Sequence, residues 1–393
     1  MTKAPSSLPP AWHHVEQHDM FPEHDHDDVA RFNFIASMNK YLSQTLGAGN
    51  ELSYEKRVRP ALQKELRREP RSRHEIREAM NRDPYHRIWS AAKRNTMEQR
   101  QQISRSIVLP QAETLADKAA DLIKAAGNLE LDPNLEIPPY IKSVDHHCMP
   151  GSYHTELIND DVSAGANYDM GMFATTGGAM GKLTDMAGCA VVDWLRDEYP
   201  DFKPKRILDI GCTIGHTVLP IAAAFPEAEV IAIDVAAPVL RYAAARAAAL
   251  GINNVRFVQA SGEDLSRFED ESFDMVYTSM FLHETSNSAI SIIMNEIFRV
   301  LAPAGLSLHL EQPSYTDEMP LYEQFIRDWD AHNNNEPFWS RLHDTSIHGE
   351  MQASGFNESD LFVAKVASAS VNEGPEDHGR GAAWHAYGAI KGE

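Results

Sequence analysis

Residues 206–217 read Arg-Ile-Leu-Asp-Ile-Gly-Cys-Thr-Ile-Gly-His-Thr, and this stretch decides the fold. Apolar residues on either side of Asp209 indicate a short buried strand, and Gly211 and Gly215 mark a turn after it. A second apolar run then ends in Asp234. The order strand, glycine turn, helix, strand and acid lets the backbone approach a ligand closely and offers a carboxylate to a ribose. The stretch therefore predicts an α/β domain that binds a nucleotide-like ligand.

Two classes of ligand suit such a turn, and the spacing of its glycines separates them. A dinucleotide fingerprint needs glycine at positions 211, 213 and 216, but Thr213 and His216 occupy two of these. An Asp-x-Gly-x-Gly-x-Gly loop for S-adenosylmethionine matches at three of four positions, and only Thr213 departs from it. S-adenosylmethionine carries an ammonium and a sulfonium, so the nearby Asp209 favours it over a pyrophosphate, which prefers bare helix amides.

Further motifs of the same fold follow in order along the chain. Strands are predicted over residues 255–258, 272–277 and 306–310, with an amphipathic helix over 289–301 before the last of them. With these motifs the chain resembles the class I S-adenosylmethionine-dependent methyltransferases. Within that family it is most similar to the branch that includes the ubiquinone and menaquinone biosynthesis methyltransferases. The resemblance covers roughly residues 203–312.

The resemblance implies a doubly wound, Rossmann-like α/β fold with a seven-stranded sheet. It implies S-adenosyl-L-methionine as cofactor, with S-adenosyl-L-homocysteine as product. Asp234 would hold the ribose, and Ser261 stands where the family often has an adenine-binding Asp. The residues that would surround the cofactor in the main domain are Asp209, Gly211, Cys212, Gly215, Asp234, Val235, Ser261, Gly262, Glu263 and Ser279.

Composition narrows the classes of partner and compartment. A formal net charge of −21 over 393 residues argues against a general nucleic-acid or anionic-membrane binder. Cys148, Cys189 and Cys212 are far apart and odd in number, which fits neither a disulfide framework nor a zinc site. No apolar run is long enough for a membrane span, and no signal peptide is evident. The chain is therefore expected to be cytoplasmic, without a metal, and to act on a small molecule.

The chain divides into four predicted regions. Residues 1–28 are rich in His, Pro and acids and are expected to form a disordered tail. Residues 29–140 are expected to form a helical N-terminal domain, 141–202 a lid and a lead-in helix, and 203–393 the methyltransferase domain. Within the helical domain, residues 51–106 carry fifteen Lys and Arg against eight Asp and Glu. These basic helices are expected to face the acidic catalytic domain or the partner in a homodimer rather than nucleic acid.

The segment over residues 142–181 combines many glycines with His and Tyr. This composition predicts a loop that closes over a ligand. Tyr168 and Asp169 loosely match a Tyr-Asp pair with which related methyltransferases cap the cofactor, so Tyr168 is a candidate cofactor-binding residue. The alternative is a long packed connection between the two main regions.

Beyond the fifth strand, the pattern predicts a helical cap and two closing strands. Residues 321–331 and 340–354 read as helices of a substrate cap. Trp329 and Trp339 are expected either to form the wall of an apolar pocket or to pack in the core. Residues 360–366 and 382–390 read as the last strands, and the chain is expected to close the sheet with an antiparallel strand.

Candidate proton acceptors come from loops at the ligand-binding edge of the sheet. His283 follows the fourth strand, and its ordinary pKa of about 6.5 suits a general base. His154 on the lid, Glu311 after the fifth strand and His378 on the last loop are the alternatives. An acceptor that is already anionic or is a free amine needs no base.

The function predicted from the sequence is methyl transfer from S-adenosylmethionine to a small-molecule acceptor. The methylated atom stays open between oxygen, nitrogen, sulfur and carbon, since the fold does not determine it. Two alternatives remain at this point: an NAD-type oxidoreductase, and a non-catalytic nucleotide-binding or assembly module.

Overall fold

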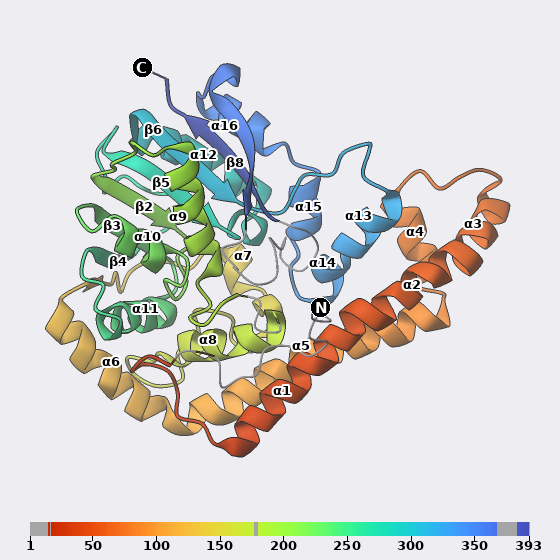
Figure 1. Cartoon of the computed structure of the whole chain (residues 1–393), viewed down its shortest axis with the longest axis horizontal. Coiled ribbons are helices and arrows are strands. Elements are labelled where there is room, and N and C mark those ends of the chain that lie inside the picture. Colours follow the sequence, from red (N-terminus) through yellow and green to blue (C-terminus); the bar gives the residue numbers. More distant parts are fainter. Residues whose placement is uncertain (1–14, 16, 177–179, 368–382, 393) are drawn as a thin grey trace, which may run out of the picture.

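A mixed eight-stranded sheet forms the centre of the molecule (Figure 1). The structure is a computed structural model that describes residues 15, 17–176, 180–367 and 383–392. The strand order is β1-β4-β3-β2-β5-β6-β8-β7. Neighbouring strands are parallel from β1 to β6, while β8 runs antiparallel to both β6 and β7. The strands are β1 Leu129–Glu130, β2 Arg206–Ile210, β3 Glu229–Asp234, β4 Val255–Gln259, β5 Phe273–Ser279, β6 Leu301–Leu310, β7 Leu361–Ala367 and β8 Ala383–Ile390.

The prediction of seven strands is wrong by one. The additional strand, β1, has only two residues, and it pairs through Leu129 with Phe257 and through Glu130 with Val258. Two residues show no periodicity, so no local pattern indicates this strand. Because β1 belongs to the main sheet, the predicted helical domain over residues 29–140 is not separate from it. The expected antiparallel strand at the C-terminal end of the chain is present as β8.

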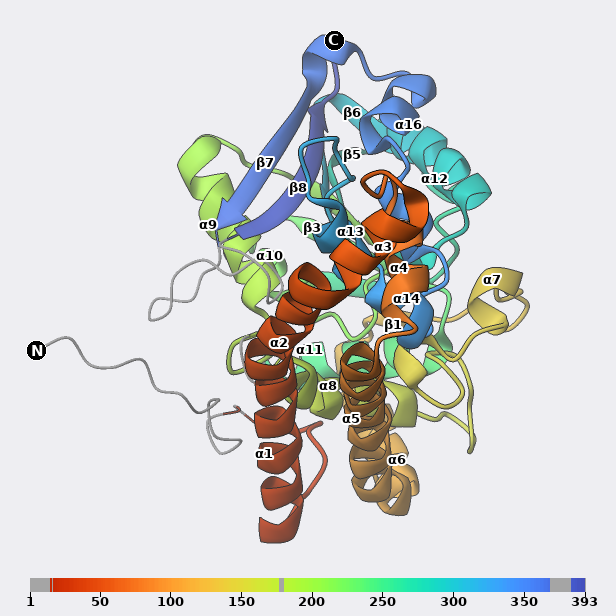
Figure 2. The same cartoon turned by 90° about the vertical axis from the view of Figure 1, so that its right-hand side faces the viewer.

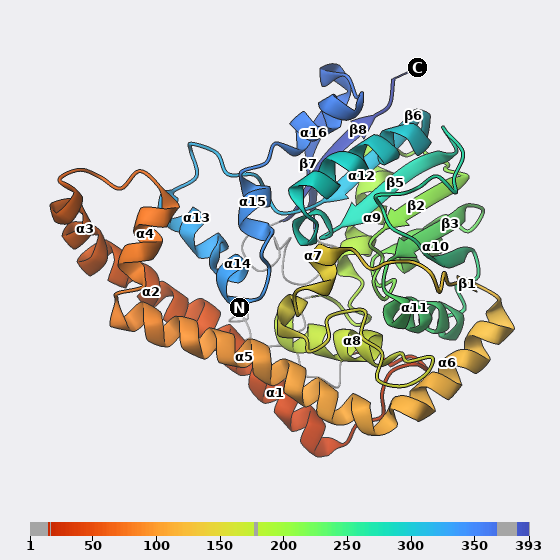
Figure 3. The same cartoon turned by 180° about the vertical axis from the view of Figure 1, so that it is seen from behind.

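The two faces of the sheet are covered by different helices (Figure 3). Alternate residues of β2 point to opposite faces, so Ile207 packs with α9, α10 and α11 while Leu208 packs with α12 and α16. Because helices cover both faces, the residues that point to either face are apolar, and the buried strands read as nearly continuous apolar runs. The helices of these two layers are α9 Met186–Glu198, α10 Val218–Ala224, α11 Ala237–Ala249, α12 Asn287–Val300 and α16 Ile347–Ser354.

The N-terminal helices form a further layer over α11, and α1 and α5 run side by side within it (Figure 2). Phe32, Met170 and Tyr242 belong to one apolar core that joins α1, α8 and α11. Two π-helical stretches, Tyr41–Leu46 and Tyr54–Val58, join α1, α2 and α3 into one continuous helical run. The helices of this region are α1 His26–Lys40, α2 Gly47–Ser53, α3 Arg59–Leu66, α4 Arg73–Met80, α5 Pro84–Val108, α6 Ala112–Ala126, α7 Pro139–Lys142 and α8 Ser163–Thr176.

The predicted disordered tail is wrong for residues 17–28; residues 1–14 and 16 lie outside the described part of the chain. Met20 and Phe21 are buried in the core beneath α1. His18 is also buried, and its Nε2 lies 3.0 Å from Oδ2 of Asp169 on α8. These contacts are tertiary and involve few apolar residues, so the composition of the segment gave no sign of them.

About a third of the segment over residues 142–181, predicted as a loop, is helix α8. Most of α8 is buried, and it packs against α5 and α11. Tyr168 faces the cavity described below, but Asp169 points to the other side and contacts Tyr242 and Arg246 of α11. Asp169 therefore does not form a cofactor-capping pair with Tyr168. The glycine-rich composition misled because glycines such as Gly165 allow close packing, here against Tyr242.

The two helices predicted for a cap, over residues 321–331 and 340–354, are four shorter helices beyond β6, and this region is called the cap below. They are α13 Leu321–Arg327, α14 Trp329–Asn333, α15 Trp339–His343 and α16. Arg73 of α4 reaches this cap and lies 2.6 Å from carboxylate oxygens of both Asp328 and Asp344. This contact matches the expectation that basic N-terminal helices face acidic residues of the catalytic half. Across the described segments, none of the helices is both long and apolar enough to cross a bilayer.

The buried cluster around Asp169 gives a test of how the N-terminal region is attached. Burial alone would raise the pKa of Asp169, but Arg246 and His18 outweigh it and lower the pKa to about 2. We expect Asp169→Ala to lower the free energy of unfolding by roughly 3–5 kcal/mol, because it leaves Arg246 buried without its counter-charge. Urea denaturation measures the change.

Asp193→Ala is the matched control, since Asp193 pairs with Arg196 at the surface with both side chains more than half exposed. Equal losses in the two variants would contradict the role of the buried cluster. The folded pKa of Asp169 lies below its ordinary value, so its contribution is present above about pH 4 and disappears as the pH falls toward 2.

Candidate functional site

A cavity of about 840 Å³ lies between the carboxyl ends of the parallel strands and the layer of N-terminal helices. The sheet side contributes Gly211 and Asp234, α8 contributes Tyr168, and α5 contributes Trp89. The cap contributes Trp339. Ligands of open α/β sheets bind at this edge, because the loops that follow parallel strands gather there. The cavity is in the usual size range of small-molecule sites.

The cavity includes some of the predicted site residues and leaves others out. Those on its wall are Tyr168, Gly211, Asp234, Val235, Ser261, Gly262, Ser279 and His283. Those that do not line it are Asp209, Cys212, Gly215, Glu263, His154 and Glu311. His378 lies outside the described residues. His154 is half-buried on the segment before α8, and burial lowers its pKa.

The turn after β2 has the backbone conformation that its glycines require. Gly211 has φ +80°, and a Cβ atom there would lie 2.2 Å from Cδ2 of the Phe281 ring. Gly215 also has a positive φ. Thr213, where the family pattern has glycine, keeps the same left-handed conformation with φ 49°. The departure in sequence therefore changes the side chain at this position but leaves the course of the backbone intact.

The acid at the end of β3 is held by the same turn. The amide of Thr213 donates to Oδ2 of Asp234 over 3.0 Å, and the amide of Ala236 donates to Oδ1 over 2.9 Å. Burial raises the pKa of Asp234 to about 6, although these amides partly counteract it. Asp209 lies deeper, with one carboxylate oxygen free of hydrogen bonds to the described residues. Burial, and secondarily Asp234, holds the pKa of Asp209 well above its ordinary value.

The loop after β4 contributes Ser261 and Gly262 to the cavity wall, whereas its acid, Glu263, does not line the cavity. Oγ of Ser261 accepts a hydrogen bond from the amide of Glu263. The Glu263 carboxylate accepts a 2.6 Å hydrogen bond from the hydroxyl of Tyr140, which does line the cavity. Tyr140 was not predicted because it lies more than a hundred residues before this loop in the sequence, so no local pattern connects the two.

His283 lies on the acceptor side of the cavity with a buried carboxylate behind it. Its Nδ1 is 2.7 Å from Oε1 of Glu311, and its ring centroid is 4.3 Å from that of Trp339. Burial alone would lower the pKa of His283, but Glu311 outweighs it and raises the pKa to about 9. Glu311, predicted as an alternative base, therefore lies where it orients the imidazole.

Several cavity residues come from the N-terminal helices and were not predicted. Trp89, Met97 and Arg100 of α5 line the wall opposite the sheet. Arg100 is 4% exposed and donates to the backbone oxygen of His147 over 3.2 Å. On the sequence these residues form an ordinary amphipathic helix, and only the packing of α5 against α8 brings them to the cavity.

The residues present fit the cofactor that the resemblance implies. A glycine lies where the backbone must approach a ligand, and an ionisable carboxylate follows it at the end of the next strand. A Cβ atom at position 211 would collide with the Phe281 ring. The packing therefore requires glycine at the position where the backbone approaches the ligand. The same cavity extends beyond this position to His283, which leaves space for an acceptor.

Comparison with known proteins identifies the central part of the chain. A family profile described as a methyltransferase domain matches residues 207–305. An uncharacterized methyltransferase of Bacillus subtilis is 32% identical over 121 residues, which are 31% of this chain and 45% of that protein. A demethylmenaquinone methyltransferase of Thermus thermophilus is 36% identical over 110 residues, which are 28% of this chain and 48% of that protein.

The chain spans about half the length of the curated relatives that it matches. Among solved structures, it is similar to Haemonchus contortus phosphoethanolamine N-methyltransferase 2 in complex with S-adenosyl-L-methionine. That structure is 18% identical, with 57% of each chain covered and a TM-score of 0.40. The sequence matches confirm the predicted resemblance over the central part of the chain.

The close contact behind Gly211 can be tested against a second glycine with the same backbone. Gly251 has φ +71°, but a Cβ atom there would meet nothing within 4 Å. We expect Gly251→Ala to cost about 1–2 kcal/mol of stability, the ordinary penalty of a left-handed alanine. Gly211→Ala should cost more and should also weaken binding of S-adenosylhomocysteine, because Phe281 must move. Urea denaturation and calorimetry measure the two effects, and equal behaviour of the variants would contradict the packing argument.

Proposed function

We propose that the chain, whose residues 207–305 form a methyltransferase domain, transfers a methyl group from S-adenosylmethionine to a small-molecule acceptor. One observation carries the proposal. Asp234 and His283 line a single cavity, the first where a ribose-binding acid belongs and the second beside a buried carboxylate. The protein thus has a donor side and an acceptor side within reach of each other.

On the donor side of the cavity, the residues of the chain bind S-adenosylmethionine and orient it. The sulfonium of bound S-adenosylmethionine supplies an electrophilic methyl group. Asp234 accepts hydrogen bonds from the ribose hydroxyls, with its carboxylate held in place by two backbone amides. Gly211 lets the backbone approach the methionine part, and the loop of Ser261 and Gly262 borders the adenine position.

On the acceptor side, His283 removes the proton that the nucleophile loses on methylation. Its Nδ1 is bound to Glu311, so Nε2 is the ring nitrogen that faces the acceptor. The Glu311 carboxylate stabilises the positive charge that develops on the imidazole, as carboxylates do behind other catalytic histidines. The raised pKa of His283 makes the neutral ring a stronger base and lowers the fraction of neutral ring at pH 7.

The N-terminal helices complete the site by closing it. Met97, Trp89 and Trp339 present large apolar surfaces to the cavity. A largely apolar enclosure aligns the acceptor with the methyl group and keeps water from competing with it. The relatives that match the central domain give no support to an oxidoreductase, and Thr213 and His216 already disfavoured that alternative.

The ribose role of Asp234 predicts a loss of affinity and a pH dependence. Each charge-assisted hydrogen bond contributes about 1.5–3 kcal/mol, so Asp234→Ala should weaken S-adenosylhomocysteine binding by about tenfold or more. Because burial raises the pKa of Asp234 to about 6, wild-type affinity should increase as the pH rises through 6. Calorimetry at several pH values measures both.

Asp330→Asn is the control for Asp234, since Asp330 lines the same cavity on α14, at the cap. Its affinity for S-adenosylhomocysteine should match that of the wild type. An Asp234→Ala variant with wild-type affinity, or tight binding of NAD in its place, would remove the ribose assignment.

The base role of His283 predicts a loss of turnover without loss of the cofactor. We expect His283→Ala and His283→Gln to lower kcat by about 10²–10⁴-fold, with affinity for S-adenosylhomocysteine nearly unchanged. Glu311→Gln should lower kcat by less, because it removes the compensating charge and leaves the ring in place. Turnover is measured with isotope-labelled donor over pools of candidate acceptors. Wild-type turnover in both His283 variants, or a loss confined to cofactor binding, would exclude the role.

A further inference from the structure

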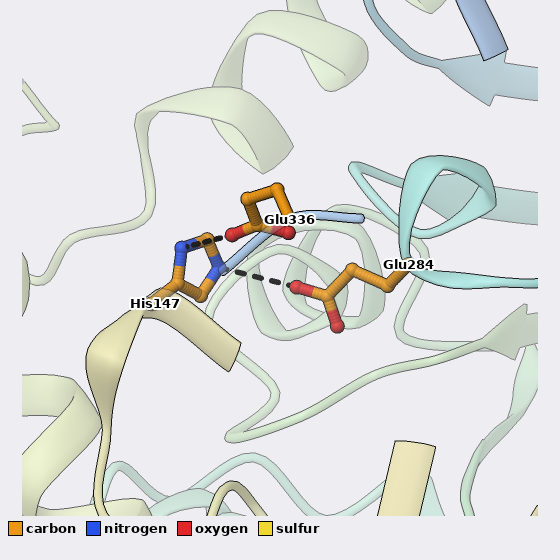
Figure 4. A group of neighbouring side chains, drawn as sticks. All are labelled: His147, Glu284 and Glu336. Atoms are coloured by element: carbon orange, nitrogen blue, oxygen red, sulfur yellow. Dashed lines mark hydrogen bonds and ion pairs between the residues drawn. The ribbon is translucent and has the colours of Figure 1, made fainter. Parts of the chain in front are cut away.

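Three ionisable side chains on the acceptor side of the cavity have no part in the proton transfer described above. They are His147 in the turn before α8, Glu284 in the turn after β5, and Glu336 between α14 and α15 (Figure 4). Nε2 of His147 lies 3.1 Å from Oε1 of Glu284, and Nδ1 lies 2.5 Å from Oε1 of Glu336. Segments far apart in the sequence thus bring an imidazole and two carboxylates together.

The charges of this cluster do not balance. Glu336 is fully buried, and the Glu284 side chain is only 13% exposed. One imidazole, even when protonated, offers a single positive charge to two carboxylates. The buried Arg100 nearby directs its guanidinium to the hydroxyl of Thr175 and the backbone oxygen of His147. Arg100 acts on Glu336 only through its charge, and its hydrogen bonds go elsewhere, so a cation bound directly between the two carboxylates would be stabilised.

The Glu336 carboxylate is the independent sign of a missing ligand. Neither of its oxygens has a hydrogen-bond partner among the described residues, although both are buried. Its 2.5 Å approach to Nδ1 of His147 is outside hydrogen-bond geometry, and the amide nitrogen of Asn334 lies 3.3 Å from the same Nδ1. A proton on His147 therefore does not satisfy Glu336. Apart from the ion-pair contact with His147, the fully buried carboxylate meets no donor among the described residues.

Left-handed backbone at His147, and at the residue that precedes Glu336, agrees with a functional role. His147 and Cys148 have φ values of 52° and 57°, and Asn335, beside Glu336, has φ 56°. Left-handed backbone outside glycine is uncommon and gathers at ligand-binding sites. Both strained turns are held from outside the cluster: Arg94 of α5 donates to Asn335, and Asn335 in turn donates to the backbone of Asp145. The turns are therefore positioned by the fold before any ligand binds.

We propose that His147, Glu284 and Glu336 bind one divalent transition-metal ion on the wall of the cavity. Their candidate ligand atoms all lie within 4.8 Å of one another. One imidazole nitrogen with carboxylate oxygens suits Mn²⁺, Fe²⁺ or Zn²⁺, whereas Ca²⁺ and Mg²⁺ prefer oxygen ligands throughout. Three protein ligands leave coordination positions open.

The open coordination positions of the metal ion would allow it to bind the acceptor. His147 and Glu284 line the same cavity as His283. The ion would bind an oxygen atom of the acceptor, such as a hydroxyl, and hold it near the base; this step rests on the proposed function. The acceptor class that fits is therefore a small molecule with a metal-binding oxygen beside the atom to be methylated.

Metal binding is tested first on the full chain without donor or acceptor. The protein is stripped with a chelator and titrated with Mn²⁺, and free Mn²⁺ is followed by electron paramagnetic resonance. We expect one equivalent to bind, Zn²⁺ to displace it, and Glu336→Gln and His147→Gln each to weaken it at least tenfold. Glu51→Gln is the matched control, because Glu51 lines the same cavity on α2 outside the cluster; it should bind as the wild type does.

Other outcomes overturn the proposal. No bound Mn²⁺ rules the site out. Equal binding in all variants means an adventitious ion only, for instance at the exposed His26, which every variant retains. Mn²⁺ should also raise the melting temperature of the wild type and of Glu51→Gln but not of Glu336→Gln. This comparison shows whether each variant is folded before its affinity is judged.

Binding of S-adenosylhomocysteine to the same metal-free samples separates this inference from the proposed function. If it binds and Mn²⁺ does not, the metal site is wrong and methyl transfer stands. If Mn²⁺ binds to the cluster and S-adenosylhomocysteine does not, the metal site stands and the proposed function is wrong.

Discussion

Helix α11 is buried on both sides, and the rest of the structure depends on this double packing. Leu240 and Ala243 face the sheet, while Val239 and Tyr242 face α8 and the N-terminal helices. Its many alanines allow both layers to approach closely, and a helix that is buried all round needs no polar face. The most deeply buried charge of α11, Arg246, is balanced by Asp169 of α8 and by backbone oxygens of Ile214 and Leu183. The helical layer is thus fixed to the sheet by apolar contacts together with one buried ion pair.

The geometry of the cavity follows from this attachment. Tyr168 and Asp169 are neighbours on α8, and successive residues of a helix point in different directions. Asp169 fixes α8 to α11, and as a result Tyr168 is held on the cavity wall. α5 packs on the other side of α8 and brings Trp89 and Arg100 over the carboxyl ends of the strands. The N-terminal region therefore serves the site as its outer wall, although it contributes only a two-residue strand to the sheet.

The limits of prediction from the sequence follow the same division between local and tertiary contacts. The turn at Gly211, the acid at Asp234 and the position of His283 belong to local patterns of strand and turn, and these could be placed in order along the chain. Asp209 and Glu263 belong to such patterns too, but their side chains point away from the cavity, and spacing alone does not reveal direction. The pairs His18–Asp169 and His147–Glu336 join residues far apart in the sequence, so no local signal could have revealed them. The stretch that matches the methyltransferase profile could be predicted because its signals are local, whereas the outer wall of the cavity depends on tertiary contacts.

Four acids around the cavity are compensated in three different ways, and the difference assigns them different tasks. Asp234 is held by backbone amides, which leave its charge in place for neutral hydroxyls to donate to. Glu311 is paired with the imidazole of His283, which makes that ring a stronger base. Glu284 and Glu336 share one imidazole and keep an excess of negative charge. A cavity with this balance attracts cations, and the donor of the proposed reaction is itself a cation that becomes neutral when its methyl group leaves. Without the proposed metal ion, the carboxylates that favour entry of the charged donor hold the neutral product less tightly. With the ion bound, Glu284 and Glu336 are neutralised, and only the charge of Asp234 retains this preference.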